Sequence, residues 1–148
     1  MRFSSSVEYA IHGLVFLATR RGGDPVLVGE VAQAIKVPES YLRKVFQVLG
    51  RAGLVRSQRG VRGGFVLGRE PASISLADIV ETIDGSLPQY ECMKARRKCS
   101  MGEACPVSAA FEEARKKMAE VLGRTTLKGL AGGIARRSPS WLAVTECA

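Results

Sequence analysis

The chain has 148 residues, an apolar fraction of 46% and a formal net charge of +8 at pH 7. This length suits one globular domain with at most an added helix, and the apolar fraction excludes a disordered chain. No stretch approaches the ~20 apolar residues of a membrane span and no signal peptide is visible, so we expect a cytoplasmic protein without a membrane partner.

The positive charge is concentrated in one part of the chain. Residues 36–69 hold eight basic residues and one acidic residue, whereas residues 71–148 hold eleven basic and nine acidic residues. A local excess of this kind is typical of a nucleic-acid contact surface, although a solvated basic face has the same composition.

Three helices are predicted in the first third of the chain. Apolar residues recur at helical spacing within residues 5–19, 28–35 and 39–52. Val37-Pro38 separates the second from the third, because proline disfavours helix in the residue before it, and Gly53 is a good stop for the third. Two short helices joined by a tight turn, the second one basic, are typical of a helix-turn-helix.

A basic hairpin is predicted directly after these helices. Residues 54–58 and 65–68 favour strands, and the glycine-rich segment Arg59–Gly64 between them carries Arg59 and Arg62. A phosphate-binding loop is excluded because no Gly-Lys-Ser/Thr ending and no helix follow. The expected fold class is therefore mainly α with a small β-hairpin wing, a winged helix-turn-helix, over residues 1–85.

Two segments match a capping box, in which side chains at both ends of a helix's first turn bond the backbone. Ser5-Ser6-Val7-Glu8 would begin the first helix, with Glu8 reaching back to the Ser5 amide. Ser75-Leu76-Ala77-Asp78 would begin a short helix that runs to Ile83, with Gly85 as its stop.

A long helix is predicted after Pro106, within a segment 107–135 that also holds a short following helix. Apolar residues on it alternate at spacings of four and three, which gives a 3.5-residue seam: Val107, Phe111, Ala114, Met118 and Val121. Such a seam favours pairing with a partner helix and hence a homodimer, although a single amphipathic core helix has a similar pattern. Residues 136–148 form a tail without a clear pattern.

Three cysteines lie within fourteen residues, in a predicted loop over residues 86–106: Cys92, Cys99 and Cys105. Thiolates bind zinc, copper(I) or iron–sulfur clusters, and zinc sites prefer closer pairs than these gaps allow. The basic run 94–98 would keep the thiols deprotonated. Free thiols and a thiol–disulfide switch are the alternatives.

A cluster held by three cysteines needs one further ligand. The candidates are His12 and Glu8, which share one face of the first helix, and Cys147 in the tail.

Several stretches together resemble the IscR/NsrR/RsrR type of bacterial winged-helix regulators, over about residues 1–135. They are MRFSSSVEYAIHGLVFLA, SYLRKVFQVLGRAGLVRSQRGVRGGFVLGR, SLADIVETIDG, the three-cysteine loop and TTLKGL. The resemblance implies that the recognition helix and wing bind palindromic DNA and that the long helix pairs two subunits. It also implies that the three cysteines hold a [2Fe–2S] or [4Fe–4S] cluster.

The fourth ligand follows from the resemblance only in part. The IscR type uses a histidine three residues after the last cysteine, where this chain has Ser108, and its first cysteine gap is one residue shorter. Other members use an acidic residue on the first helix, and Glu8 stands at the matching place.

We therefore expect a transcription factor that responds to redox state, nitric oxide or iron. Its predicted contacts with the major groove come from the recognition helix: Ser40, Tyr41, Arg43 and Lys44. Arg59 and Arg62 would reach phosphates or the adjacent minor groove. The alternatives are a cluster-free regulator acting by a thiol switch or a protein partner, and a small iron–sulfur redox protein. No convincing catalytic pair is present, so we expect neither an enzyme nor a small-molecule substrate.

Overall fold

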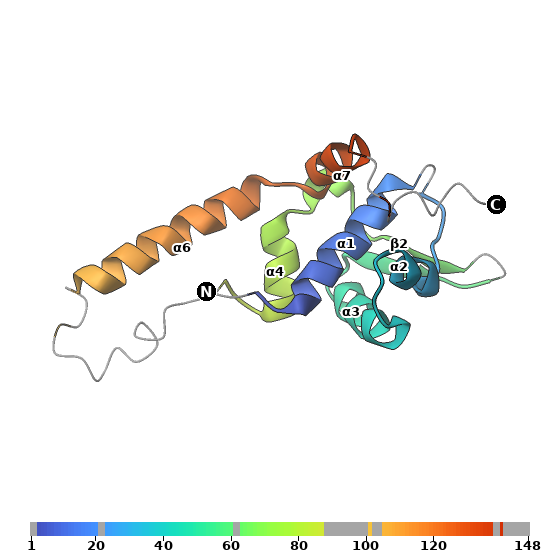
Figure 1. The fold of residues 1–148 in the computed structure, drawn as a ribbon, viewed down its shortest axis with the longest axis horizontal. Coiled ribbons are helices and arrows are strands. Elements are labelled where there is room, and N and C mark those ends of the chain that lie inside the picture. Colours follow the sequence, from blue (N-terminus) through green and yellow to red (C-terminus); the bar gives the residue numbers. More distant parts are fainter. Residues whose placement is uncertain are drawn as a thin grey trace.

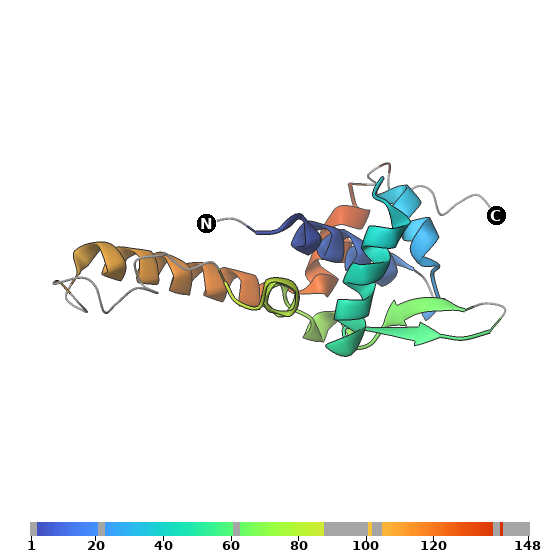
Figure 2. The same ribbon diagram turned by 90° about the horizontal axis from the view of Figure 1, so that it is seen from below.

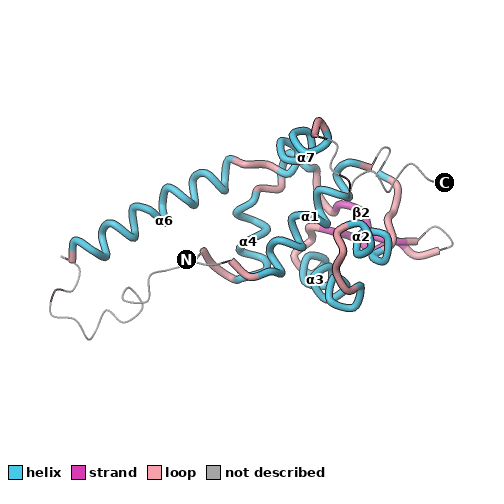
Figure 3. The backbone as a smooth tube through the Cα atoms, viewed as in Figure 1, coloured by secondary structure: helices cyan, strands magenta, loops and turns pink. Residues whose placement is uncertain are grey.

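In a computed structural model the chain is mainly helical with one short hairpin (Figures 1 and 3). The structure describes residues 3–20, 23–60, 63–87, 101, 105–137 and 140. Its elements in chain order are α1 (Ser5–Thr19), α2 (Val28–Ala34), α3 (Glu39–Arg51), β1 (Val55–Gln58), β2 (Gly64–Leu67), η2 (Pro71–Ser73), α4 (Leu76–Asp84), α6 (Pro106–Arg124) and α7 (Leu127–Ala135). This order of helices and hairpin confirms the predicted fold class.

Helix α1 lies at the centre of the core, packed against α3, α4 and α7. The buried side chains recur along most of its length: Val7, Ala10, Leu14, Val15, Phe16 and Leu17. Gly13 lies where α1 crosses α3, and a β-carbon there would stand 2.7 Å from Cε2 of Phe46. Glycine at this position therefore sets how closely α3 approaches α1.

The helix-turn-helix consists of α2 and α3. All four apolar positions expected on the third helix are buried: Leu42, Val45, Phe46 and Leu49. The turn between the helices places Lys36 at a φ of 55°, and the Val37 N–H donates to the Ala32 carbonyl at 3.0 Å. Both helices end one residue before the predicted boundary, the usual uncertainty at a frayed end.

The hairpin pairs β1 with β2 in antiparallel register, from Val55 opposite Leu67 to Gln58 opposite Gly64. A third segment joins them, because Val26 and Phe65 exchange backbone hydrogen bonds of 3.0 and 2.8 Å. A β-carbon on Gly64 would lie 2.7 Å from the Val26 carbonyl oxygen. This glycine therefore allows the segment before α2 to lie against the wing.

The two predicted capping boxes have different outcomes. Ser75 caps α4 as predicted, since its hydroxyl accepts from the Asp78 N–H and the Asp78 carboxylate accepts from the Ser75 N–H at 2.8 Å. The box at Ser5 to Glu8 is wrong. The N-cap of α1 is Ser4, so Glu8 stands one residue beyond the position that reaches back to the cap. Ser4 instead donates its N–H and its hydroxyl to the Asp84 carboxylate, at 3.0 and 2.6 Å.

Helix α6 extends away from the rest of the molecule (Figures 1 and 2). No residue of α6 is buried, and only its last turns reach the core. There Met118, Ala119 and Leu122 pack against a small cluster around Val7 and Val80. None of the helices in the described residues combines the length and the apolar run that a membrane crossing needs.

Helix α7 packs against α1 and holds the C-terminal end of α6 in place. Leu127 and Ala131 are buried, and Thr126 caps the helix by accepting from the Gly129 N–H. The Leu127 N–H donates to the Ile74 carbonyl at 2.8 Å and the Leu76 N–H donates to the Thr125 carbonyl at 2.9 Å. The short connection between α6 and α7 is therefore hydrogen-bonded to the backbone at the start of α4.

Candidate DNA-binding surface and cysteine site

The exposed face of α3 carries the residues predicted to meet DNA. Ser40, Tyr41, Arg43 and Lys44 are all exposed, while Leu42 between them is buried in the core. Figure 2, which views the molecule from below, shows α3 in front with the hairpin extending beside it. The sequence prediction of a recognition helix next to a basic wing therefore has a matching geometry.

The two basic residues of this face differ in their surroundings. Arg43 forms an ion pair with Glu39, one turn earlier on the same helix. Lys44 has no ion pair within the part of the chain that the structure describes, so its charge is available to a phosphate. Since Glu39 is exposed, Arg43 can exchange it for DNA at little cost.

Tyr41 is held by α1. Its hydroxyl lies 2.6 Å from the Ser6 hydroxyl, and its ring meets Tyr9 edge to face at 5.6 Å between centroids. Hydrogen bonds from the side chains of Ser6 and then Ser5 lower the pKa of Tyr41. The sequence analysis missed Ser6 and Tyr9 as supports, although their spacing of three residues places them on one face of α1.

The wing presents more basic residues than the two predicted at its tip. Arg59 is exposed just after β1, and Arg62 lies outside the described residues. Arg56 is also exposed, on the outer face of β1. In the sequence analysis Arg56 contributed only to the local positive charge. Because successive side chains of a strand point to opposite faces, its place next to the apolar Val55 was the signal that it faces outward.

Cys105 is the N-cap of α6. The pKa of its thiol is lowered by the backbone N–H of Ser108, then by the Ser108 hydroxyl and the backbone N–H of Val107. The sulfur accepts no capping hydrogen bond, so the lowered pKa comes from these nearby donors, which stabilise the negative charge of the thiolate. This position favours the thiolate that binds metals. Cys92 and Cys99, the other two predicted ligands, lie outside the described residues.

Glu8 is exposed on α1 and lines a hollow of about 500 Å³ together with Ser5, Ile11 and His12. Cys105 lies far from this hollow. It begins α6, whereas Met118, thirteen residues further on, packs against the cluster that contains Val7, and thirteen helical residues span about 20 Å. One chain therefore does not bring Glu8 and Cys105 together.

The predicted seam of α6 is largely exposed. The exposed fractions of Val107, Phe111 and Val121 are 52%, 38% and 46%, and Ala114 is exposed as well. Met118 differs, because it is half-buried against the cluster around Val7 of its own chain. Met118 thus lies at the edge between the exposed seam and the core.

Comparisons with known proteins identify relatives of this chain. The family described as Rrf2, iron-dependent transcriptional regulator, matches residues 3–133. A helix-turn-helix-type transcriptional regulator of Aquifex aeolicus is 36% identical over 132 residues, covering 88% of this chain and 91% of the relative. The structure of CymR, the global cysteine regulator of B. subtilis, has a TM-score of 0.76 at 30% identity and covers 90% of this chain and 98% of its own. The structure of T. potens IscR has a TM-score of 0.73 at 28% identity, covering 94% and 92%. These relatives are transcriptional regulators, not enzymes or electron carriers.

Proposed function

Since the chain belongs to the Rrf2 family of DNA-binding transcriptional regulators, we propose that it acts as a homodimer whose DNA affinity depends on an iron–sulfur cluster. In this proposal Cys92, Cys99 and Cys105 hold the cluster, and Glu8 of the partner subunit supplies the fourth ligand. The observation that carries the proposal is the position of Cys105. Its thiol is biased toward the thiolate, and it begins the helix that extends away from the core.

The donor set suits such a group. Iron in these clusters binds thiolates, and the surroundings of Cys105 favour that form. Glu8 is a harder ligand, on a helix that is already rigid, so binding it requires little ordering. When bound, the cluster would supply a centre that can gain or lose an electron. The protein could also lose the whole cluster.

The DNA contacts in this proposal are the predicted ones. Ser40, Tyr41, Arg43 and Lys44 enter the major groove, and Arg59 and Arg62 reach phosphates or the minor groove. Two winged helix-turn-helix domains related by the symmetry of a dimer would read a palindromic operator. The exposed seam of α6 would supply the dimer contact.

The link between the two sites would run along α1. Ser6 and Tyr9 flank Glu8 in the sequence and both contact Tyr41 on α3. A ligand that holds Glu8 would therefore also bias the position of Tyr41. Such a switch works only if the two forms of the protein differ in DNA affinity.

The proposal is tested by the absorption spectrum and the iron and sulfide content of anaerobically purified protein. We expect a coloured wild-type protein, and a Glu8→Ala variant that keeps its helical circular dichroism but loses iron. Glu81→Ala, an exposed glutamate on α4, is the matched control and should keep the cluster, as should a chain truncated before Cys147. An unchanged spectrum and iron content in Glu8→Ala would remove Glu8 from the ligand set.

A second candidate function is a cluster-free regulator that works through thiol chemistry. The likeness to CymR, whose name describes it as a cysteine regulator, favours it. This candidate predicts a colourless, iron-free protein with full DNA affinity. Peroxide should then change the DNA affinity of the wild type and have no effect on Cys105→Ser.

A further inference from the structure

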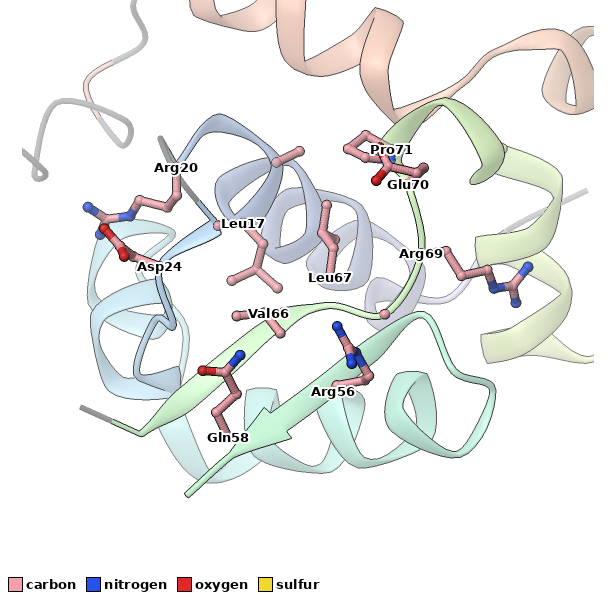
Figure 4. Close-up of a pocket in the computed structure, with 13 residues that line it drawn as sticks. Leu17, Arg20, Asp24, Arg56, Gln58, Val66, Leu67, Arg69, Glu70 and Pro71 are labelled. Carbon is pink, nitrogen blue, oxygen red and sulfur yellow. The ribbon is translucent and has the colours of Figure 1, made fainter. Parts of the chain in front are cut away.

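A hollow of about 570 Å³ opens on the outer side of the wing sheet, between the end of α1, the hairpin and the segment leading to α4 (Figure 4). Pockets for small ligands have volumes of about 300–1,000 Å³. Phe65 meets Phe46 of α3 on one face of the sheet, and the next residue, Val66, lines the hollow. Because successive side chains of a strand alternate, the hollow is on the face of the sheet that is turned away from α3.

Two polar side chains of β1 face this hollow. Arg56 stands opposite Val66 in the register, and Gln58 follows two residues later on the same face. Figure 4 shows the Arg56 guanidinium directed into the hollow from below. Within the described residues neither side chain has a hydrogen bond or an ion pair, so the donors of both are available to a ligand.

A buried donor at the edge of the hollow lacks an acceptor. Arg20 stacks over Phe16 at 4.8 Å and approaches Glu30 at 3.9 Å, yet its Nε is buried without a hydrogen-bond partner. The rim also carries Arg69, which is bonded to the Ala52 carbonyl, and the acids Asp24 and Glu70. In Figure 4 both carboxylates lie across the hollow from Arg56, so its charge is not neutralised by them.

The floor of the hollow is apolar, formed by Leu17, Val66 and Leu67. We propose that this hollow binds a small organic anion, a carboxylate or a phosphate monoester, whose charged group meets Arg56 and Gln58 and whose apolar body lies on Leu17 and Val66. The occupant would join the end of α1 to the wing strands. The residues that line the hollow include no cysteine, and a ligand bound there would give the protein a second input to its DNA affinity.

The experiment titrates the purified full chain with four probes and follows binding by calorimetry and by backbone amide shifts. Hexanoate and hexyl phosphate carry both parts of the expected ligand, whereas 1-hexanol lacks the anion and inorganic phosphate lacks the apolar body. We expect saturable binding of at least one of the first two probes, with shifts at Val66 and Leu67. Which of the two binds more tightly distinguishes a carboxylate from a phosphate ester.

Two substitutions on the exposed face of β1 locate the binding. Arg56→Ala should lower the affinity for the probe by at least about tenfold, which is the typical effect of losing a charge-assisted hydrogen bond. Gln58→Glu should also weaken it, because the new charge repels the anion. Arg124→Ala, an exposed arginine at the end of α6, is the matched control and should change nothing.

Each other outcome overturns the proposal. Absence of saturable binding up to millimolar probe would overturn it, and so would equal binding of inorganic phosphate, which marks an adventitious ion only. Equal losses in Arg56→Ala and Arg124→Ala would show nonspecific attraction to a basic protein. A loss of DNA affinity in Arg56→Ala without binding of any probe would make Arg56 a DNA contact instead.

Discussion

The head of the molecule, which comprises α1 to α4, the hairpin and α7, differs from the protruding helix α6 in how its apolar side chains are buried. In the head, α1 and α3 each bury a continuous apolar face in one core. Helix α6 is longer than either, yet none of its residues is buried and its apolar seam is exposed. A helix in a protein gains most of its stability from packing such a face against other elements. The head therefore buries its apolar faces within one chain, whereas one chain leaves most of the seam of α6 exposed; the proposed homodimer would cover it.

The largest expected effect comes from a charge placed in the seam of α6. Phe111→Glu should raise the free energy of dimer formation by about 3–5 kcal/mol, the cost of leaving a charge buried without a partner. Sedimentation should show monomers, and operator binding should be much weaker, while the thermal unfolding of the head stays near that of the wild type.

The matched control for this prediction is Lys116→Glu on the same helix. Lys116 is exposed and lies on the side of α6 opposite the seam, so the control should remain dimeric. A wild-type chain that sediments as a monomer at micromolar concentration would contradict the contrast between head and helix.

A cavity in the core of the head should lower the stability of the fold and leave dimer formation unchanged. Leu42 is completely buried between α3 and the core, so Leu42→Ala should lower the free energy of unfolding by about 2–5 kcal/mol. The folded fraction should still dimerise as the wild type does. Denaturant unfolding and sedimentation at one protein concentration measure the two effects separately. If Val107→Ala on α6 destabilised the fold as much, the seam would belong to the core of one chain.

The head could be predicted from the sequence because local patterns specify it. The spacing of Leu42, Val45, Phe46 and Leu49 gave the buried face of α3, and Ser75 with Asp78 gave the start of α4. These signals lie within a few residues of the feature that they specify. The helical period and the caps follow directly from backbone geometry.

Contacts between distant segments could not be predicted in this way. Ser4 bonds Asp84 across 80 residues, and Ser6 bonds Tyr41 across 35. The predicted box at Ser5 to Glu8 failed for this reason, because a tertiary partner determined where α1 begins. The contacts of Ser40, Arg43 and Lys44 with DNA, and the set of cluster ligands, remain predictions.

The wing allows DNA affinity to be changed without changing either the core or the seam. Arg59 is exposed after β1, and Arg59→Ala should weaken binding to all DNA sequences alike. We expect a loss of about 1.5–3 kcal/mol and a salt dependence lower by about one unit in slope. Titrations of specific and unrelated duplexes at several salt concentrations measure both. Unchanged affinity and slope would mean that the wing does not contact the backbone.

The smallest expected effect is at α4, the helix through which the head contacts α6. The backbone N–H of Ser75 is the main cause of a lowered pKa for Asp78; partial burial opposes the shift, while the Ser75 hydroxyl and the charge of Arg69 add to it. A carboxyl whose pKa is lower in the folded chain stabilises the fold above its ordinary value of 3.8, and this contribution is lost as the pH falls through the lowered pKa. Asp78→Asn should therefore lower the free energy of unfolding by about 0.5–1 kcal/mol at neutral pH. This difference from the wild type should shrink at pH values below the ordinary pKa of 3.8.

Urea unfolding followed by circular dichroism at several pH values measures this difference, with Glu81→Gln on the exposed side of the same helix as the control. A difference that stays constant down to the acid limit would mean that Asp78 acts through its hydrogen bonds alone and that its charge contributes nothing.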